Sequence, residues 1–394
     1  MSKEETYPAQ TIYRSDARRL PRNGFTHANQ FKLFENGSEL YERMLNVIDS
    51  AEHEINLEVY IFREDNAGLP FVEHLIKASQ REVTVRIIID AWGSFSFSNN
   101  FLYKLERAGA EIVRYRPFSP FTGGWGWRRR DHRKLMTVDQ KIGFIGGMNI
   151  GREYMAREDG GFGIRDTHLE VHGPVVKQIN DVFSYNWQNH HQALDTLTEK
   201  MESDETACTC ESDEACARIS RGRWKAKNLI REEYLNQIQQ ADKYIKLTQS
   251  YFLPTEDILE ALYRARERGC CVELIVPGVS DVPPLQYGTR YLYSDLLEHG
   301  IQVYEYTDSL LHSKTAVIDD SWATVGTFNF DYQSIFHNLE VNITVKGKQF
   351  ARKMRERFET DIERSRKIDS QHLSEWNWWD WTCARFWHWF RWAL

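Results

Sequence analysis

Two nine-residue stretches decide how this sequence is interpreted: residues 131–139 read DHRKLMTVD, and residues 311–319 read LHSKTAVID. Both contain the pattern HxKxxxxD. At average residue usage, one such match arises by chance in a chain of this length roughly a few times in a hundred. Two matches are far rarer. The motifs supply the candidate catalytic residues His132, Lys134, Asp139, His312, Lys314 and Asp319.

The agreement between the two stretches continues on both sides of the motifs. A glycine and an asparagine follow each motif at the same spacing, as Gly146 and Asn149 in the first and as Gly326 and Asn329 in the second. Upstream, three segment pairs match: EVYIF (58–62) with QSYFL (249–253), VRIIID (85–90) with VELIVP (272–277), and AGAEIVRY (108–115) with HGIQVYEY (299–306). A duplication is the simplest explanation of this pattern.

Within each copy, apolar strand-like runs alternate with amphipathic helix-like runs, which is typical of a parallel sheet covered by helices. We therefore predict an α/β fold of two halves related by a pseudo-twofold axis, with mixed, mainly parallel sheets flanked by helices. The expected units are residues 1–195 for the first half, 196–222 for a polar, acidic linker, 223–370 for the second half, and 371–394 for a tryptophan-rich tail.

Length and charge limit the classes of protein that this chain represents. Its 394 residues, 41% of them hydrophobic, suffice for two ordinary domains or one large double unit. A net charge of −7 is unlike that of proteins that coat nucleic acid, which carry a basic surplus. No run of about 20 apolar residues and no apolar signal core is present. We expect no nucleic-acid partner and no membrane span.

The six cysteines do not form the dense framework of a disulfide-stabilised domain, so free thiols are expected. Cys208, Cys210 and Cys216 cluster in the acidic run TACTCESDEACAR. Because no second ligand pair stands at a zinc spacing, a surface linker is favoured over a metal site here.

The motif spacing indicates the chemistry. Residues i and i+2 share one face of a strand, so the histidine and lysine of each motif point the same way. If the halves pack about a twofold axis, two imidazoles and two ammonium groups converge on one pocket. Such a pocket suits a phosphodiester: one histidine attacks phosphorus, the other protonates the leaving oxygen, and the cations oppose the negative charge.

The paired motifs and the repeat resemble the phospholipase D superfamily, from about residue 30 to about residue 365. This resemblance implies two α/β halves of the phospholipase D type, no metal ion or other cofactor, and a phosphohistidine intermediate. It also implies His132 as the nucleophile and His312 as the general acid and base, with the reverse order left open.

A carboxylate usually holds the far nitrogen of such a histidine. The candidates are Asp166 in IRDTHLEV and Glu340 in FHNLEVNI, where the superfamily commonly has an acidic residue. We align His168 with Glu340, which leaves Asp166 and Glu170 as alternatives in the first half.

The remaining motif residues are assigned supporting roles. Asp139 and Asp319 are expected to anchor their strands rather than to touch the substrate. Asn149 and Asn329 are expected to contact the phosphate, with plain turn residues as the alternative.

Two segments bear on the substrate. The loop PFSPFTGGWGWRRRDHRK (117–134) sets tryptophans beside arginines, a combination that suits an anionic phospholipid, although an ordinary basic turn is an alternative. Its candidate lipid-binding residues are Trp125, Trp127, Arg128, Arg129 and Arg130.

The C-terminal stretch SEWNWWDWTCARFWHWFRWAL (374–394) holds seven of the 13 tryptophans. As a helix it is too short and too charged to span a bilayer, so we expect it to lie in the membrane interface. Packing on the protein's own core or on a second subunit is the alternative.

The segments IGGMNIG (145–151) and VGTFNFD (325–331) resemble bacterial cardiolipin synthases of the short type. That resemblance implies transfer of a phosphatidyl group to the primary hydroxyl of phosphatidylglycerol, by a peripheral enzyme on the cytoplasmic face of the bacterial inner membrane. Its partners would be anionic phospholipids and the membrane surface. The donor lipid and a helper protein or homo-oligomer are left open.

Other members of the superfamily remain as alternatives. A phospholipase would use the same residues with water as the acceptor, and a phosphatidylserine synthase would need serine and a cytidine-activated donor. A nuclease is a more distant alternative, because it should show a basic groove and little interfacial aromatic content.

Overall fold

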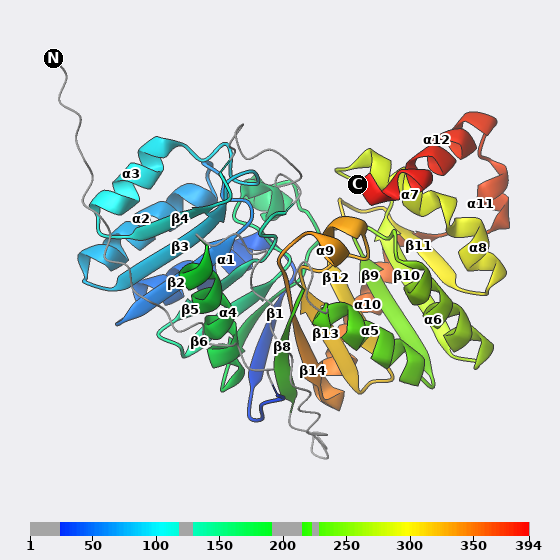
Figure 1. Cartoon of the computed structure of the whole chain (residues 1–394), viewed down its shortest axis with the longest axis horizontal. Helices are drawn as coiled ribbons and strands as arrows, with labels where there is room; N and C mark the ends of the chain where they lie inside the picture. The colour runs from blue at the N-terminus through cyan, green and yellow to red at the C-terminus, as the bar shows by residue number, and fades with distance from the viewer. Residues whose placement is uncertain (1–23, 118–128, 191–214, 223–227, 394) are drawn as a thin grey trace.

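The computed structural model describes residues 24–117, 129–190, 215–222 and 228–393. Figure 1 shows two α/β halves side by side, the first coloured blue to green and the second green to red. Trp125, Trp127 and Arg128 of the expected lipid-binding loop lie outside the described residues, as do Cys208 and Cys210.

The first half contains a seven-stranded sheet in the order β1-β7-β6-β5-β2-β3-β4. Its strands are β1 (Gln30–Phe34), β2 (Glu54–Val59), β3 (Thr84–Asp90), β4 (Glu111–Tyr115), β5 (Leu135–Val138), β6 (Ile142–Gly146) and β7 (His168–His172). Only β2, β3 and β4 run parallel to one another, and the other neighbouring pairs are antiparallel.

The second half repeats this arrangement in an eight-stranded sheet, β15-β11-β10-β9-β12-β13-β14-β8. Its strands are β8 (Cys216–Gly222), β9 (Tyr244–Gln249), β10 (Cys271–Pro277), β11 (Gln302–Tyr306), β12 (Lys314–Ile318), β13 (Trp322–Gly326), β14 (Glu340–Lys346) and β15 (Ser365–Lys367). Apart from the added β15, every strand occupies the place of a counterpart in the first sheet.

The expected fold class, two α/β halves with mixed sheets flanked by helices, is confirmed. Fewer strands of each sheet are parallel than the sequence led us to expect. Only β9, β10 and β11 are parallel in the second half, as β2, β3 and β4 are in the first. The reason is that each motif strand opens a tight hairpin, β5–β6 or β12–β13, and a tight turn can join only antiparallel strands.

Helices cover both faces of each sheet (Figure 1). The first half has α1 (Gly37–Asp49), α2 (Gly68–Gln80), α3 (Asn99–Arg107) and α4 (Val175–Asn189). The second has α5 (Leu229–Gln240), α6 (Glu256–Glu267), α7 (Pro283–Tyr291), α8 (Tyr293–Glu298), α9 (Tyr332–Phe336), α10 (Lys348–Glu363), α11 (Ser370–Ser374) and α12 (Trp378–Trp389). Strand β3 shows the two-sided burial: Ile87 and Ile89 pack in the core of the first half, whereas Ile88 packs in a second core with α4.

Helix α1 illustrates how local sequence produces these elements. The side chain of Asn36 caps it by accepting a hydrogen bond from the Glu39 amide at 3.2 Å. Its buried residues, Leu40, Met44, Val47 and Ile48 among them, recur at helical spacing and face the core of the first half.

The second core, which includes Ile88, joins the two halves. Ile145 of β6, Ile179 of α4, Val325 of β13 and Val341 of β14 are all fully buried in it. Because side chains from both sheets share this core, the halves form one packed unit with the motifs at their junction.

Two edge strands, β1 and β8, are absent from the sequence-based prediction. They occupy equivalent edges of the two sheets and lie side by side, and Thr26, four residues before β1, forms a bridge with Ala217 of β8. Strand β8 is formed by the last residues of the predicted linker. Its CARISRG pattern buries Ala217 and Ile219 between the halves, and the Ile219 amide donates to Gln178 of α4.

The cysteines differ from expectation at one position. Cys270, Cys271 and Cys383 are free, but Cys216 at the start of β8 is disulfide-bonded. The expectation of free thiols is therefore wrong at Cys216. The number and spacing of the cysteines carry no information on which of them the fold brings together.

Candidate active site

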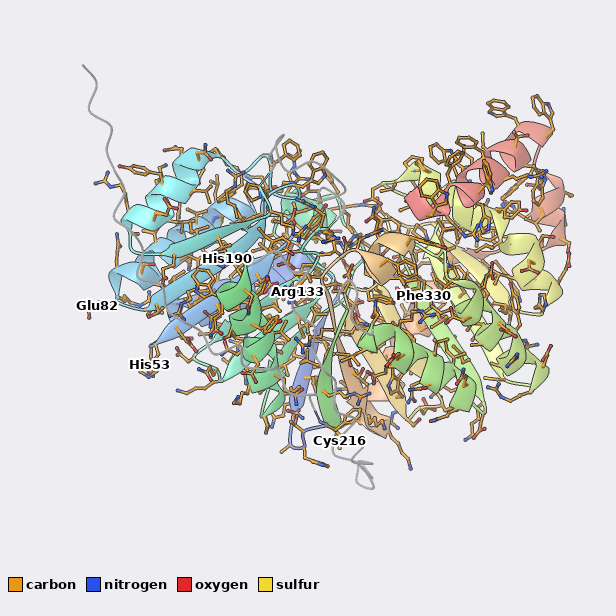
Figure 2. The ribbon with its side chains drawn as sticks, viewed as in Figure 1. His53, Glu82, Arg133, His190, Cys216 and Phe330 are labelled. Atoms are coloured by element: carbon orange, nitrogen blue, oxygen red, sulfur yellow. The ribbon has the colours of Figure 1, made fainter. Side chains whose placement is uncertain are left out.

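The two motifs lie at the start of equivalent strands. Lys134 directly precedes β5 and Lys314 is the first residue of β12. The Lys134 ammonium donates to the His132 carbonyl at 2.6 Å, and Lys314 donates in the same way to the His312 carbonyl. Both lysines and His312 are buried. Figure 2 shows Arg133, the neighbour of His132, near the junction of the two halves.

Each motif histidine is held by a carboxylate from the opposite half. His132 Nδ1 lies 3.1 Å from Glu340 Oε2, and His312 Nδ1 lies 2.7 Å from Asp166 Oδ2. Both carboxylates are fully buried. With Nδ1 donating to the carboxylate, each imidazole is left with Nε2 available for chemistry.

Crossed backbone hydrogen bonds produce this pairing. The His132 amide donates to the Leu339 carbonyl at 3.0 Å, and the His312 amide donates to the Arg165 carbonyl at 2.8 Å. Leu339 directly precedes Glu340, and Arg165 directly precedes Asp166. Each motif therefore forms a short parallel bridge to the opposite half, one residue from the carboxylate that its histidine needs.

The strand register corrects one part of the sequence alignment. Gly146 pairs with His168 in the first sheet, and the equivalent Gly326 pairs with Asn342 in the second. His168 is therefore the counterpart of Asn342, and Asp166 is the counterpart of Glu340. The alignment of His168 with Glu340 is wrong by two residues, because strand alternation alone does not distinguish positions two apart.

The alternative carboxylate of the first half, Glu170, serves another purpose. It accepts from Arg43 at 2.7 Å and from His172 at 2.8 Å. Those partners leave Asp166 as the carboxylate that contacts a motif histidine.

The two carboxylates are ionised but differently surrounded. Burial would raise the pKa of Glu340 and Asp166, but the adjacent histidine and lysine charges hold both below their usual values. Glu340 also accepts from the hydroxyls of Thr327 and Ser334 and from the Asn338 amide. Asp166 accepts from His312 and from the Thr167 amide.

Burial also shifts the basic groups. It lowers the pKa of His132 to about 4, and the charges of Lys134 and Lys314 act in the same direction. Burial lowers the pKa of Lys134 to about 7 and of Lys314 to about 8. Burial and the charge of Lys314 lower the pKa of His312 as well. An anionic phosphodiester would restore the missing counter-charge and raise all four values.

The motif aspartates lie at the other end of their strands. Asp139 accepts from the amides of Glu52, His53 and Glu54 at 2.8–2.9 Å, and Asp319 accepts from those of Asp242, Lys243 and Tyr244 at 2.7–2.9 Å. Figure 2 shows His53 at the edge of the first half, well away from Arg133. These contacts tie each hairpin to the turn before β2 or β9.

The two asparagines follow the motif hairpins at equivalent sequence positions but differ in their contacts. Asn149 Oδ1 accepts from the Ile61 amide at 3.0 Å, and its Nδ2 donates to the Tyr154 hydroxyl at 2.8 Å. Asn329 is buried, and its Oδ1 has no hydrogen-bond partner among the described residues.

With this geometry in place, comparison with known proteins identifies the family. A family model described as "Cardiolipin synthase, PLD-like domain" matches residues 44–187 and 234–362, which include both motifs. The chain belongs to this family.

Curated relatives support the same family assignment. A cardiolipin synthase of Alkalihalophilus pseudofirmus is 33% identical over 358 residues, covering 90% of this chain and 70% of that protein. Cardiolipin synthase B of Salmonella typhi is 33% identical over 374 residues, covering 91% and 87%. Among solved structures, phosphatidylserine synthase of Haemophilus influenzae has a TM-score of 0.73 at 14% identity, covering 93% of this chain and 95% of that one, which shows a shared fold.

Three tyrosines of this phospholipase D-like chain were missed by sequence reasoning. The Tyr60 ring lies 5.0 Å from the His132 ring, and the Tyr251 ring lies 6.4 Å from the His312 ring. The Tyr154 hydroxyl is 3.5 Å from His312 Nδ1. The matched segments EVYIF and QSYFL hold Tyr60 and Tyr251 at equivalent positions, so the repeat itself carried this signal.

Two of the described arginines near the first motif, Arg130 and Arg133, bind other groups of the protein. Arg130 donates to the Arg116 carbonyl at 3.2 Å and lies 3.6 Å from Asp90. Arg133 is buried between Glu58 and Asp131, at 2.8 and 3.0 Å. Arg129 is partly exposed.

The tryptophan-rich tail of this chain both packs and exposes aromatic rings. Helix α12 lies against α7, where His388 stacks on Tyr291 at 4.5 Å and Ala384 is fully buried. Its exposed residues are Trp378, Trp379, Phe386, Trp389 and, just beyond, Trp392. None of the helices in the described part of the chain combines the length and apolar character needed to cross a bilayer.

Proposed function

We propose that this protein synthesises cardiolipin, by moving a phosphatidyl group from one phospholipid to the primary hydroxyl of phosphatidylglycerol through a phosphohistidine intermediate. The observation that carries the proposal is the pair of motif histidines, each hydrogen-bonded to a buried carboxylate of the opposite half. The matching family model and the curated cardiolipin synthases support the substrate class.

In the first half-reaction, Nε2 of His132 attacks the phosphorus of the donor lipid. The P–N bond forms as the P–O bond to the departing headgroup alcohol breaks. His312 gives its Nε2 proton to that oxygen, so the alcohol leaves neutral. Lys134 and Lys314 oppose the negative charge on the nonbridging oxygens.

The surroundings of the carboxylates favour this division of roles. Glu340 shares its charge among several donors, so it stabilises a protonated His132 weakly and leaves a neutral imidazole for attack. Asp166 has fewer donors and lies closer to its histidine, at 2.7 Å against 3.1 Å, so it better stabilises the protonated acid at His312.

In the second half-reaction, the primary hydroxyl of phosphatidylglycerol takes the place of the departed alcohol. Neutral His312 accepts the hydroxyl proton at Nε2 while the oxygen attacks phosphorus. The P–N bond breaks, which releases cardiolipin and returns His132 to its starting state. A site that admitted water in place of the alcohol would instead yield phosphatidic acid.

The proposal includes peripheral attachment to the cytoplasmic face of the bacterial inner membrane, with anionic phospholipids as partners. The exposed tryptophans of α12 support an interfacial tail, because indole rings favour the headgroup region. The similarity to bacterial cardiolipin synthases supports a bacterial membrane as the place of action. Protease should cut the tail in inside-out vesicles but not in intact spheroplasts, and the opposite pattern would place the protein on the other face.

The test is incubation of the purified protein with liposomes of phosphatidylglycerol, alone and then with phosphatidylethanolamine, followed by mass spectrometry of the lipids. Cardiolipin is the expected product, and free glycerol or ethanolamine identifies the donor. Phosphatidic acid without cardiolipin would show a hydrolase, and unchanged lipids would reject both activities.

A further inference from the structure

The exposed large apolar side chains are not scattered over the surface. Among the described residues, all lie on the tail or on four connections between strands, and one of them, Tyr103, is on helix α3 within the connection that follows β3. The other residues on the connections are Trp92 (58% exposed), Phe95 (74%), Phe162 (54%), Val279 (69%) and Phe336 (42%). We call these five residues the mouth collar.

The four connections come in pairs, two from each half. Trp92 and Phe95 follow β3, and Val279 follows the equivalent β10. Phe162 lies between β6 and β7, and Phe336 lies between β13 and β14. Each of these phenylalanines stands six residues before a register-matched strand residue, His168 or Asn342. The internal symmetry that builds the active site therefore also arranges the collar around it.

Collar loops of the first half contact groups that touch the catalytic histidines. The Ser94 hydroxyl, between Trp92 and Phe95, donates to the Tyr60 carbonyl at 2.9 Å, and the Tyr60 ring faces His132. Tyr154, at 3.5 Å from His312, opens the connection that carries Phe162.

Collar connections of the second half also contact groups beside the catalytic histidines, through other atoms. Tyr251, whose ring faces His312, donates to Asp281 at 2.8 Å, two residues after Val279. The Ser334 hydroxyl donates to Glu340 at 2.8 Å, two residues before Phe336. Connections that carry collar residues therefore contact groups beside the catalytic histidines or their carboxylates in both halves.

The exposed side of the tail continues the collar. Helix α12 packs on α7, which begins four residues after Val279, and residues Arg391–Ala393 lie against α9, which ends at Phe336. Figure 1 shows α7, α9 and α12 together at one end of the second half.

We propose that the mouth collar binds the surface of the lipid bilayer, so that the active site opens directly onto the headgroup layer. This inference rests on the proposed phospholipid substrate. The catalytic groups are buried, with the His132 side chain 12% exposed, so a lipid must bring its phosphate a short way inward while its chains stay in the membrane. Apolar residues around the opening of the site let the phosphate enter while the lipid chains stay in apolar surroundings, so the free-energy cost is small.

Charge complementarity favours a bilayer that contains anionic lipid. The exposed guanidinium of Arg152 lies 5.0 Å from the Phe162 ring, so a cation sits beside a residue that would enter the interface. An aromatic ring next to an exposed cation is suited to the headgroup boundary of a phosphatidylglycerol membrane.

The test uses the full chain with Trp92→Ala and Phe95→Ala combined, because these residues are on the first half, remote from the tail. Sedimentation with vesicles of equal parts phosphatidylglycerol and phosphatidylcholine should show affinity reduced about tenfold or more. Turnover of a short-chain, monomeric phosphatidylglycerol should stay within about twofold. Tyr103→Ala is the matched control, an exposed aromatic of the same half outside the collar, and it should bind as the parent does.

Vesicle binding is also measured in the His132→Ala background, which separates this inference from the proposed function. If Trp92→Ala with Phe95→Ala weakens vesicle binding in that inactive background, the collar binds the bilayer, whatever product the active enzyme makes. Unchanged vesicle affinity, an equal loss with Tyr103→Ala, or an equal loss of monomer turnover would overturn the inference.

Discussion

Glu340 of the second half accepts a hydrogen bond from His132 of the first, across a sequence separation of 208 residues. The reciprocal pair, His312 and Asp166, spans 146 residues in the opposite sense. Neither half therefore holds a complete histidine–carboxylate pair. The active site exists only when the halves are packed together, and a core of buried apolar residues from both halves holds them in that arrangement.

Replacing either carboxylate with its amide should lower turnover. Glu340→Gln and Asp166→Asn remove the charge that orients and stabilises each imidazole, so we expect kcat to fall roughly 10²–10⁴-fold. Glu170→Gln is the matched control, because Glu170 binds Arg43 and His172, and it should retain activity. Steady-state kinetics on detergent-dispersed lipid measures all three, and an active Asp166→Asn variant would contradict the crossed pairing.

The pH profile of kcat/KM should be bell-shaped. His132 must be neutral to attack, and because its pKa is lowered to about 4, activity should rise with pH through that region. The alkaline limb has two sources, because Lys134 must be charged to oppose the phosphate and His312 must be protonated to act as the acid. Burial lowers the pKa of both groups, that of Lys134 to about 7, so activity should already be falling by about pH 7. Lys134→Arg stays protonated, so a limb that moves upward in this variant belongs to Lys134 and an unmoved limb belongs to His312. Full activity well above that region would contradict both assignments.

Asp139 should matter for stability rather than for chemistry. Asp139→Ala leaves three backbone amides without their acceptor at a residue with φ of 51°, so we expect a loss of about 1–3 kcal/mol in the free energy of unfolding. Asp139→Asn keeps an acceptor and tolerates that backbone, so it should lose less. Urea unfolding gives the comparison, and a large fall in kcat with full stability would instead place Asp139 in the chemistry.

The tail should serve membrane binding. Trp389→Ala with Trp392→Ala removes two exposed rings without touching Ala384 or His388, which contact α7. Vesicle affinity should fall about tenfold, while turnover of detergent-dispersed lipid is kept. If both quantities fell together, the tail would be a structural element of the second half.

Much of this structure could be predicted from the repeated motif. The two HxKxxxxD segments and their matched surroundings gave the two mixed α/β halves and the side-by-side placement of histidine and lysine. The edge strands β1 and β8 escaped prediction because each mixes polar with apolar residues and gains its stability by packing at the junction, which no local pattern records.

The crossed pairing could not be derived from the sequence either. Asp166 and Glu170 both follow the first motif, and because they are four residues apart they would point to the same face of a strand. Only the register of Gly146 with His168 identifies Asp166 as the counterpart of Glu340. The amphipathic pattern of the tail indicated an interfacial helix, but it could not show that α12 would rest on α7 with its tryptophans outward.

The most direct test of the account is to trap the covalent intermediate. A phosphatidyl donor with an activated leaving group needs no acid, so His312→Ala should react once and stop, because no base activates the acceptor. Peptide mass spectrometry of the quenched protein should then find the phosphatidyl group on His132, and His132→Ala should carry none. An adduct on His312 in the His132→Ala variant, or full turnover without either histidine, would contradict the mechanism.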